Sequence, residues 1–575
     1  MSSDPKLQLV ELLRAALMAV APEASATEIL IERPKQASHG DFASNLAMQL
    51  ARSLKKNPRE IAQKILDALP ASPMIQKAEM AGAGFINFTL SQSARTDVIA
   101  DVLARGAEFG RIALGAGRNV QVEFVSANPT GPLHVGHGRG AAYGASLASV
   151  LDFAGFKVTR EYYVNDAGRQ MDILAVSTWL RYLDALGVVI PFPPNAYQGD
   201  YVREMARSIL SAEGAAYRHD AGEILAGVAA ADGDIEAHLD GLIAAGKRLL
   251  GEGWQRIHQF ALSEQLADGR RDLEAFGVVF DVWYSENSLY ASGKVAHVVE
   301  RLEKSNHIYV KDGAKWFRST AFGDEKDRVV QRDNGLFTYF ASDIAYHCDK
   351  YERGFDRIID VWGADHHGYI PRVKGALTAL GLNSAKLDVA LVQFVSLYRD
   401  GEKASMSTRS GEYVTLRQLR EEVGNDACRF FYMLRKSDLA LDFDLDLATS
   451  QSNDNPVYYV QYAHARICSV LGQTIDIETG KADRSLLTSP HELALCAQLR
   501  EFPTVVETAA VDYAPHGIAF YLKELAAGFH GWYNAERLLV DNAALRQSRL
   551  ALATAVRQTL ANGLKLLGVT APESM

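Results

Sequence analysis

The sequence predicts a multidomain α/β protein, with a parallel-sheet middle domain that carries a helical insertion, a small α+β N-terminal domain and an all-α C-terminal domain. Three observations support this fold class. A chain of 575 residues is too long for one hydrophobic core. Between residues 119 and 164 a strand, a glycine-rich turn, a helix and a second strand follow one another, which is the order of a βαβ unit. From about residue 416 onward nearly every segment has apolar residues at helical spacing.

The composition is that of an ordinary globular protein, with 48% hydrophobic residues, 23% charged residues and a net charge of −10. No apolar run reaches the length of a membrane span, and the N-terminus has the pattern of an amphipathic helix rather than of a signal peptide. We therefore expect no membrane partner and a cytoplasmic location. The four cysteines lie far apart without CxxC spacing, which argues against a zinc knuckle or a disulfide framework. The acidic total argues against a chain coated in nucleic acid, although a local basic groove is compatible with it.

The N-terminal domain is expected over residues 1–112. Two helical patterns flank the polar segment PKQASHGDFASNLAMQLA, and the strand-like end AGFINFTLS follows. A glycine-rich joint, RIALGAG, then leads into the middle domain.

The middle domain is expected over residues 113–415. It begins with the alternating strand NVQVEFV, continues through the helix AAYGASLASVLDFAG and returns in the strand KVTREYYV. A long Ala-rich helical stretch from about 176 to 275 is predicted to be an insertion. Strand-like runs return at FDVWY, HIYV, GLFTYF, RIIDVWG and LDVALVQFVSLY. The remaining residues, 416–575, are expected to form the helical C-terminal domain, with turns at DNP and TSP.

The turn that follows the first strand of the βαβ unit reads NPTGPLHVGHGRG and carries His134 and His137. A turn from a parallel strand into a helix exposes backbone N–H groups and the positive end of the helix dipole, which together suit an anion. Glycines at 136, 138 and 140 would let a bulky ligand approach the backbone, and imidazoles can donate hydrogen bonds to phosphate oxygens. The turn contains no Asp or Glu that would complete a metal site, and it is neither a Walker loop nor a dinucleotide fingerprint. The alternative is that both histidines only cap the helix.

The same turn resembles the adenylate-binding signature His-Ile-Gly-His of class I aminoacyl-tRNA synthetases, with Val135 at the isoleucine position. The second signature of that family, Lys-Met-Ser-Lys-Ser, is expected after the last strand, where this chain reads GEKASMSTRSGEYVTL. Both lysines of the pattern are missing in place, with Lys403 two positions before the first lysine slot and Arg409 one position after the second. This form, with GEYVTL behind it, resembles arginyl-tRNA synthetases. The alternative is an ordinary solvated basic loop.

The resemblance implies a Rossmann-like catalytic domain and the activity of an arginine–tRNA ligase. Such an enzyme uses ATP to activate L-arginine as arginyl-adenylate and transfers the arginyl group to the 3′-terminal adenosine of tRNA(Arg), releasing AMP and diphosphate. ATP is then a substrate accompanied by Mg²⁺, and we expect no protein-bound metal site. The implied partners are tRNA(Arg), L-arginine and ATP, and a monomer is expected. The family also implies that activation needs bound tRNA.

Arginine recognition needs acceptors that face the guanidinium fork in a partly dry pocket. By the resemblance, Glu123 contacts the α-amino group and Asn128 holds the carboxylate end. Asp343 binds the guanidinium, Tyr339 lines the pocket from the same face of a helix, and His367 lies near the adenosine and substrate site. Each has a purely structural alternative, because Asp343 could cap a helix, Glu123 could pair with a surface lysine and Tyr339 could belong to the core.

The resemblance also assigns the groups that act on ATP. Positively charged side chains on a flexible loop can meet the charge that builds on leaving pyrophosphate. The catalytic candidates are His134, His137, Lys403 and Arg409. The ATP-binding candidates are Pro132, Gly136, Gly138, Gly363, Asp365, His366, Met406 and Ser407.

Residues 441–471 and the segment YVNDAGRQ also match the arginyl pattern. Aromatic side chains beside basic groups suit unstacked RNA bases, whereas an apolar helix stripe is the competing interpretation. The C-terminal helices resemble the family's anticodon-binding domain, and the N-terminal unit resembles its appended domain, which touches the outer corner of the tRNA. The candidates for tRNA binding are Tyr458, Tyr459, Tyr462 and Arg466.

Three other functions compete with this one. A class I synthetase for glutamate or glutamine fits the histidine turn but not the acidic Asp343. A small nucleotidyltransferase also uses such a turn, but the long helical C-terminal region argues against it. A catalytically silent RNA-binding paralogue is favoured only by the altered lysine loop, since both histidines are intact.

Overall fold

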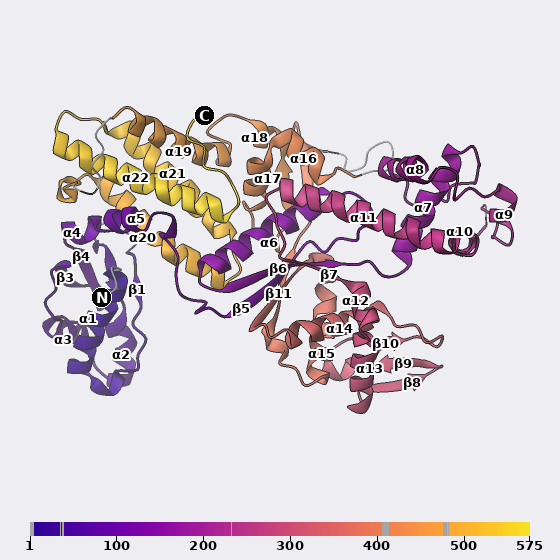
Figure 1. Cartoon of the computed structure of the whole chain (residues 1–575). Coiled ribbons are helices and arrows are strands. Elements are labelled where there is room, and N and C mark those ends of the chain that lie inside the picture. The colour runs from indigo at the N-terminus through magenta and orange to yellow at the C-terminus, as the bar shows by residue number, and fades with distance from the viewer. Residues whose placement is uncertain are drawn as a thin grey trace.

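The computed structural model describes residues 5–34, 36, 39–231, 233–404, 413–474, 480 and 482–575. It has the predicted fold class: an N-terminal α+β unit, a central parallel sheet with inserted units, and a C-terminal bundle of helices (Figure 1). Within the part of the chain that the structure describes, no helix is both long and apolar enough to cross a membrane.

The N-terminal unit is a four-stranded antiparallel sheet covered by helices, with strand order β1-β2-β4-β3. The strand predicted in AGFINFTLS is β4, and its two neighbours were not identified from the sequence. Buried Leu9, Leu13, Ile86 and Phe88 belong to one hydrophobic cluster. The buried residues of this cluster lie between Leu9 and Ala94 in the sequence. The elements are α1 (Pro5–Val20), β1 (Ile31–Glu32), β2 (Phe42–Ser44), α2 (Leu46–Leu54), α3 (Pro58–Asp67), β3 (Ile75–Ala81) and β4 (Phe85–Leu90).

The centre of the molecule is a five-stranded sheet of order β12-β11-β5-β6-β7, in which all neighbours are parallel. From β5 the chain passes through α6 to β6 on one side, whereas β11 pairs with the other side of β5. Connections that leave in opposite directions open a crevice at the carboxyl edge of the sheet, where α/β folds bind ligands. The elements are β5 (Asn119–Glu123), α6 (Val135–Phe153), β6 (Lys157–Val164), β7 (Val282–Ser285), β11 (Arg357–Gly363) and β12 (Leu387–Val392).

Helix α6 lies against this sheet at unusually close range. A Cβ atom on Gly144 would lie only 2.2 Å from the ring of Phe124, so that a side chain at position 144 would push the helix away.

Arg139 of α6 is buried, and its guanidinium donates three hydrogen bonds of 2.8–2.9 Å to backbone carbonyls. These carbonyls belong to Gln393, Lys436 and Leu439.

The predicted helical insertion is present and extends away from the sheet (Figure 1). Its helices run from Arg169 to Ala275, where the sequence predicts about 176–275. Trp179, Tyr182 and Trp254 are members of its own hydrophobic cluster. The helices are α7 (Arg169–Ala185), α8 (Asp200–Glu213), α9 (Ala221–Leu225), α10 (Ile235–Leu250) and α11 (Glu252–Ala275).

A second inserted unit contains an antiparallel sheet of order β10-β9-β8, of which only β8 was predicted, in HIYV. The predicted strand in GLFTYF is wrong. Thr338 is the N-cap of α14. Apolar residues after it are buried at helical spacing, since Phe340 and Ile344 belong to one hydrophobic cluster. The elements are α12 (Glu286–Ala291), α13 (Lys294–Lys304), β8 (Ile308–Lys311), β9 (Ala314–Phe317), β10 (Arg328–Gln331), α14 (Tyr339–Glu352) and α15 (Ile370–Ala379).

The segment LDVALVQFVSLY forms two strands, β12 and β13, rather than one. Among the described residues after 416, the one strand between the helices is β15, which pairs in parallel with β13. The pairing of β13 with β15 crosses the expected domain boundary between residues 415 and 416. The domain boundaries stay predictions. The elements are β13 (Val395–Arg399), β14 (Glu402–Lys403), α16 (Leu416–Val423), α17 (Asn425–Tyr432), β15 (Leu441–Asp444) and α18 (Leu445–Thr449).

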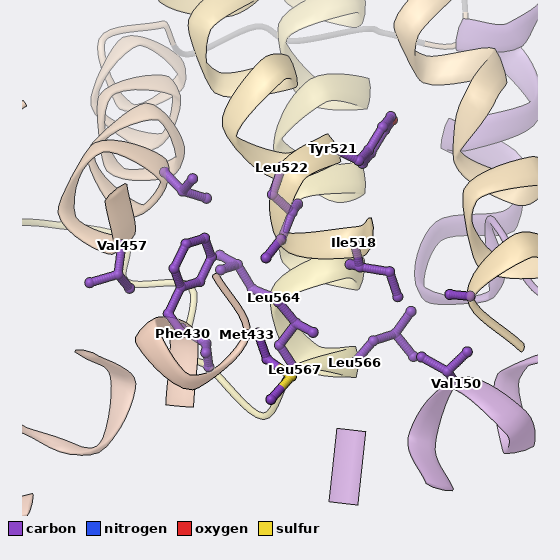
Figure 2. Packing of buried hydrophobic residues seen from close by; sticks show 14 of the residues in the cluster. Val150, Phe430, Met433, Val457, Ile518, Tyr521, Leu522, Leu564, Leu566 and Leu567 are labelled. Atoms are coloured by element: carbon purple, nitrogen blue, oxygen red, sulfur yellow. The ribbon is translucent and has the colours of Figure 1, made fainter. Parts of the chain in front are cut away.

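The C-terminal bundle shares its hydrophobic core with the central unit. Figure 2 shows Val150 of α6, Phe430 of α17 and Leu564 of α22 in one cluster. The turns predicted at DNP and TSP are helix starts, with Asn455 capping α19 and Ser489 capping α20. The helices are α19 (Pro456–Gly472), α20 (Pro490–Val511), α21 (His516–Ala535) and α22 (Ala543–Leu566).

The N-terminal unit docks on this bundle through polar contacts. Arg33 forms an ion pair with Glu501 of α20 at 2.5 Å, and Arg500 donates to the carbonyls of Ala94 and Arg95 at 2.8 and 2.9 Å. Two short helices, α4 (Gln92–Thr96) and α5 (Val98–Arg105), follow the docked sheet, and buried residues of α5 belong to the core that the bundle and the central unit share. The first and last parts of the chain therefore lie side by side (Figure 1).

Gly144→Ala should destabilise the protein, because the added methyl group would overlap the Phe124 ring. Overpacking of this kind costs about 1–3 kcal/mol, measured as a lower denaturant midpoint. The matched control is Gly269→Ala on α11, where a Cβ atom would meet nothing within 4 Å. The control should stabilise the helix by up to about 1 kcal/mol. Equal effects of the two substitutions would contradict the close approach of α6 to the sheet.

Candidate active site

A cavity of about 590 Å³ opens at the carboxyl edge of the central sheet, at the crevice between β5 and β11. Its walls come from the ends of β5, β6, β11 and β12, from the first turn of α6 and from α14. Nine of the residues predicted from the sequence line it: Glu123, Asn128, His134, Gly136, His137, Asp343, Gly363, Asp365 and His366.

The two histidines form the N-terminal cap of α6. The Nδ1 atom of His134 accepts hydrogen bonds from the backbone N–H groups of Gly136 and His137 at 3.1 and 3.2 Å. The Nδ1 atom of His137 accepts from the backbone N–H of His134 at 3.3 Å, which completes a capping box. The rings stack with centroids 3.5 Å apart. The alternative that both histidines cap the helix is therefore correct for their Nδ1 atoms. The Nε2 atoms take no part in the cap and can bind a ligand.

This geometry fixes the chemistry of the imidazoles. A neutral imidazole that accepts through Nδ1 carries its proton on Nε2, so each ring has an Nε2–H donor. Burial lowers the pKa of His134, and burial together with the neighbouring His134 lowers the pKa of His137 to about 3. Both rings are therefore neutral hydrogen-bond donors at physiological pH.

The expectation that backbone N–H groups of the turn bind an anion is wrong. The N–H groups of Gly136 and His137 are used by His134, and the N–H of Gly138 donates to the carbonyl of His134 at 3.2 Å. The N–H of Val135 donates to the carbonyl of Val414 at 3.3 Å. The anion-binding capacity of this turn therefore comes from the Nε2–H groups and from the helix dipole.

The three glycines of the turn have different roles. Gly136 and Gly140 line the cavity, and a Cβ atom on Gly136 would lie 2.9 Å from the His134 ring. Gly138 faces the core instead, where a Cβ atom would lie 2.6 Å from Leu416 and 2.9 Å from the Tyr432 hydroxyl. The expected contact of Gly138 with the ligand is therefore corrected to close packing of α6 on the helices that follow.

The segment after the predicted lysine loop is joined to the histidine turn. The N–H of Leu416 donates to the carbonyl of Leu133 at 2.7 Å, and the Tyr413 hydroxyl donates to the carbonyl of Pro132 at 2.7 Å. The Tyr413 ring meets the His134 ring edge-on at 5.3 Å. Pro132 thus supports the turn and does not line the cavity.

The predicted loop is described up to residue 404 and again from residue 413. Met406, Ser407 and Arg409 lie outside the described residues. Lys403 is exposed on β14, pairs with Tyr398 of β13, and does not line the cavity. Among the described residues, the cavity wall has no lysine and no arginine.

Glu123 lies at the end of β5 in a buried network of charges. Its carboxylate accepts from Lys350 Nζ at 2.5 Å and from the Ser126 hydroxyl at 2.8 Å. Lys350 is fully buried and also binds Asp360 of β11 at 2.7 Å. Burial raises the pKa of Glu123. Burial also acts to raise the pKa of Asp360, but Lys350 and His347 together outweigh it and hold that pKa at about 2. The partner of Glu123 is therefore a buried lysine rather than a surface one.

Asp343 faces the cavity from α14 and accepts a hydrogen bond from the Tyr369 hydroxyl. Burial raises the pKa of Asp343, and the bond from Tyr369 opposes this rise. Tyr339 is 52% exposed and is not among the cavity residues, and its hydroxyl points toward Gly168. Tyr339 therefore lies outside the wall that it was expected to line.

His367 is exposed and does not line the cavity, so the structure does not bring it to the predicted site. From the 3-10 turn, Ala364 to Tyr369, the residues that line the cavity are Asp365, His366 and Tyr369, of which the first two are exposed. Sequence reasoning missed Tyr369, and the signal for it was its place two residues after His367 in the same motif.

Sequence reasoning also missed a second carboxylate, Glu286, beside Asp343. One Glu286 oxygen accepts from the Ser342 hydroxyl at 2.8 Å. The other oxygen and the Tyr163 hydroxyl form no hydrogen bond of good geometry, but Tyr163 lies close enough to lower the pKa of Glu286 against the effect of burial. Burial and Asp343 raise the pKa of Glu286 to about 7. Burial and the carboxylates of Glu286, Asp343 and Glu123 raise the pKa of Tyr163. The signal was available, since Glu286 directly follows β7 at the carboxyl edge of the sheet.

The candidates for RNA contact lie elsewhere, on α19. Tyr458 and Tyr462 stack at 5.9 Å, and Arg466 donates to the Tyr462 hydroxyl at 2.6 Å and lies 4.7 Å from the Tyr533 ring centroid. Tyr459 packs on His530 and on the hydrophobic core. Helix α19 therefore has half-exposed aromatic side chains, which suit RNA bases, as well as an aromatic side chain that packs on the core. The role of these side chains in RNA binding stays a prediction.

Three family profiles match successive parts of the chain. The arginyl tRNA synthetase N terminal domain matches residues 7–90, and the catalytic domain of class I (R) tRNA synthetases matches residues 98–187 and 243–440. The DALR anticodon binding domain matches residues 460–575. The gap in the catalytic match falls within the helical insertion.

Similar proteins cover the whole chain. The sequence is 67% identical to the arginine–tRNA ligase of Azoarcus sp. (strain BH72) and 65% identical to that of Dechloromonas aromatica (strain RCB), with 100% of both chains covered in each case. The solved arginyl-tRNA synthetase of Thermus thermophilus superposes with a TM-score of 0.74 at 26% identity, covering 99% of this chain and 100% of that one. A putative arginyl-tRNA synthetase from Campylobacter jejuni reaches a TM-score of 0.74 at 32% identity, covering 84% and 100%.

The neutral state of His137 predicts that acid weakens the folded protein. A histidine in an unfolded chain titrates near pH 6.5, whereas the pKa of His137 in the fold is about 3. Below pH 6.5 the unfolded chain binds a proton that the folded protein does not, so this contribution to stability is present above pH 6.5 and is lost as the pH falls toward 3. The denaturant midpoint should therefore fall less between about pH 7.5 and 5.5 for His137→Asn than for the unsubstituted protein.

The control is His491→Asn, because His491 is exposed at the start of α20. This variant should keep the pH dependence of the unsubstituted protein. The same slope in all three proteins would contradict a neutral, half-buried His137.

Proposed function

The chain belongs to the arginyl-tRNA synthetase family, and on this premise we propose how its residues perform the reaction. It is an arginine–tRNA ligase, with ATP as a substrate. Arginine and ATP give arginyl-adenylate and diphosphate, and the arginyl group then passes to the 3′-terminal adenosine of tRNA(Arg) with release of AMP. The competing assignments, a synthetase for glutamate or glutamine and a nucleotidyltransferase, do not fit the family and the acidic cavity.

One observation supports the first step above all, namely the pair of neutral imidazoles at the start of α6, each with an Nε2–H donor. The arginine carboxylate attacks the α-phosphorus in line, and pyrophosphate leaves. Charge that builds on the phosphate oxygens is stabilised by the Nε2–H groups of His134 and His137 and by the helix dipole. The cap holds the donors in place before the reaction, so no reorganisation is needed at the transition state. No side chain acts as a nucleophile.

The acidic cavity selects arginine, which carries a positive charge at each end. Asp343, which lines the cavity, accepts from the guanidinium, with Tyr163 in the same wall. Glu286 is not in that wall and acts on the site through its charge, which raises the pKa of Tyr163. Glu123 accepts from the α-ammonium group at the end of β5. Asn128 accepts a hydrogen bond from Asn165 through its carbonyl at 2.9 Å, which leaves its own amide N–H groups for the substrate carboxylate.

The leaving pyrophosphate needs positive charge that the described wall of the cavity does not supply. Lys403 and Arg409 are the proposed sources, by their place in the sequence motif. A Mg²⁺ ion is proposed to accompany ATP. No group of three or more His, Cys, Asp or Glu side chains that could hold a metal occurs among the described residues. The triphosphate itself is thus the proposed ligand of that ion.

The tRNA is proposed to contact the N-terminal unit and the aromatic side chains of α19. Tyr458, Tyr462 and Arg466 are partly exposed and offer stacking surfaces beside a positive charge. The acceptor is the 2′ hydroxyl of the terminal ribose, by the class I resemblance. The requirement of tRNA for activation, the monomeric state and the cytoplasmic location stay predictions.

The function is tested by arginine-dependent exchange of labelled pyrophosphate into ATP, with and without tRNA(Arg). Exchange that requires tRNA supports both the adenylate step and its dependence on tRNA. Exchange without tRNA supports the adenylate step and removes that dependence. If neither mixture exchanges while tRNA(Arg) still binds, the proposed chemistry is wrong.

His137→Ala should reduce the rate of exchange on the order of 10²-fold, because it removes one donor to the transition state. The loss should appear equally in kcat and in kcat/KM for ATP, as expected for an interaction made only in the transition state. His491→Ala, far from the cavity wall, is the matched control and should keep full activity. Unchanged turnover of His137→Ala would remove His137 from the mechanism.

A further inference from the structure

Tyr369 lies between the 3-10 turn that follows β11 and helix α15, and its hydroxyl donates to the Asp343 carboxylate. The ring is enclosed on its other sides. Phe340 meets it edge-on at 6.1 Å, Trp362 lies at 6.0 Å, and the Arg372 guanidinium lies 4.8 Å from its centroid.

A buried ion network fixes the Arg372 side of the ring. Asp324 accepts from Arg372 at 3.1 Å and from Arg328 of β10 at 2.8 Å, and its side chain is 4% exposed. The two arginines hold the pKa of Asp324 far below its usual range. The position of Tyr369 is therefore determined by three neighbouring elements, α14, α15 and the inserted sheet.

A carboxylate on a helix can rotate about two side-chain bonds, and a guanidinium distinguishes among the resulting orientations because its donors form a planar fork. A fixed hydroxyl on Oδ2 of Asp343 selects one orientation. No donor among the described residues binds Oδ1, so Oδ1 remains an acceptor on a residue of the cavity wall, to which Tyr163 also belongs. Such preorganisation strengthens binding by reducing the ordering that the substrate must impose.

We propose that Tyr369 is a positioning residue for arginine selection, whose hydroxyl holds the Asp343 carboxylate in the orientation that accepts the substrate guanidinium. The proposal rests on the proposed role of Asp343 as a guanidinium ligand. It assigns to Tyr369 no contact with the reacting atoms.

The hydrogen bond also favours the charged form of Asp343. Burial raises the pKa of this carboxyl, and the Tyr369 hydroxyl is the largest influence that lowers it. Without the hydroxyl, Asp343 should bind a proton at higher pH, and arginine affinity should then fall more steeply as the solution becomes acidic. The other titratable groups that face Asp343 are His347 and Lys350 on α14, Asp360 on β11, Tyr163 on β6, and Glu286 and Tyr290 on α12.

The test compares Tyr369→Phe with Tyr351→Phe in arginine-dependent exchange in the presence of tRNA(Arg). Tyr369→Phe keeps the ring and its packing, and loss of one hydrogen bond to a charged group should raise the KM for arginine about tenfold. The KM for ATP and kcat should stay within about twofold. Tyr351 is on the same helix as Asp343, donates to the carbonyl of Asn383 at 2.9 Å, and does not line the cavity. Its variant should leave arginine affinity unchanged.

A double-mutant cycle with Asp343→Asn separates the two proposals. If Asp343→Asn raises the KM for arginine and Tyr369→Phe adds nothing further to it, the positioning role is supported. If Asp343→Asn raises the KM but Tyr369→Phe alone does not, the positioning role is overturned and the proposed function stands. If the two effects multiply independently, Tyr369 acts without Asp343 and the positioning role is again overturned. No effect of Asp343→Asn would overturn the assignment of Asp343 and the inference with it.

A pH series distinguishes positioning from a general loss of structure. As the pH is lowered, the KM for arginine of Tyr369→Phe should rise more than that of the unsubstituted enzyme, while the KM for ATP follows the same curve in both. Calorimetric titration of arginine alone provides a second measurement that does not depend on turnover. Parallel pH curves for arginine would overturn the proposal.

Discussion

The whole active site depends on one buried ion network, in which Lys350 of α14 binds Glu123 of β5 and Asp360 of β11. The two strands are neighbours at the crevice of the sheet. β5 ends at Glu123 and β11 ends at Gly363, and both residues line the cavity. Without the lysine two carboxylates would face each other out of water, which is strongly unfavourable. The network therefore fixes the sheet edge, the orientation of α14 and the acidic character of the pocket together.

The sequence predicts the parts of this site that follow from local pattern. Alternating apolar residues identify β5, and glycines with two histidines identify the turn into α6. The site residues found from local pattern are therefore those of one turn. Glu123 was assigned by the resemblance, and it lies at the crevice because parallel strands share one carboxyl edge.

Other features depend on contacts between distant segments and have no local signature. The aromatic run GLFTYF has the composition of a strand, but Tyr339 begins a helix because α14 packs on the sheet. β15 exists only through its pairing with β13, some forty residues earlier in the chain. The sequence motif predicts free backbone N–H groups in the histidine turn, yet these groups donate to the His134 ring and to the carbonyl of Val414. Glu286 and Tyr369 matter because of where Asp343 lies in space.

Helix α6 extends from the two catalytic histidines to the core that the central unit shares with the C-terminal bundle. Its first turn carries the histidines, and its body lies in the core shared with the C-terminal bundle, where the Tyr143 hydroxyl donates to the carbonyl of Tyr513 at 2.8 Å. A helix of 19 residues is a stiff rod about 28 Å long. A tilt imposed on the buried end of this rod is transmitted to the imidazoles. Genetic lesions in the bundle can therefore present as slow catalysis in an enzyme whose substrate pocket is chemically intact.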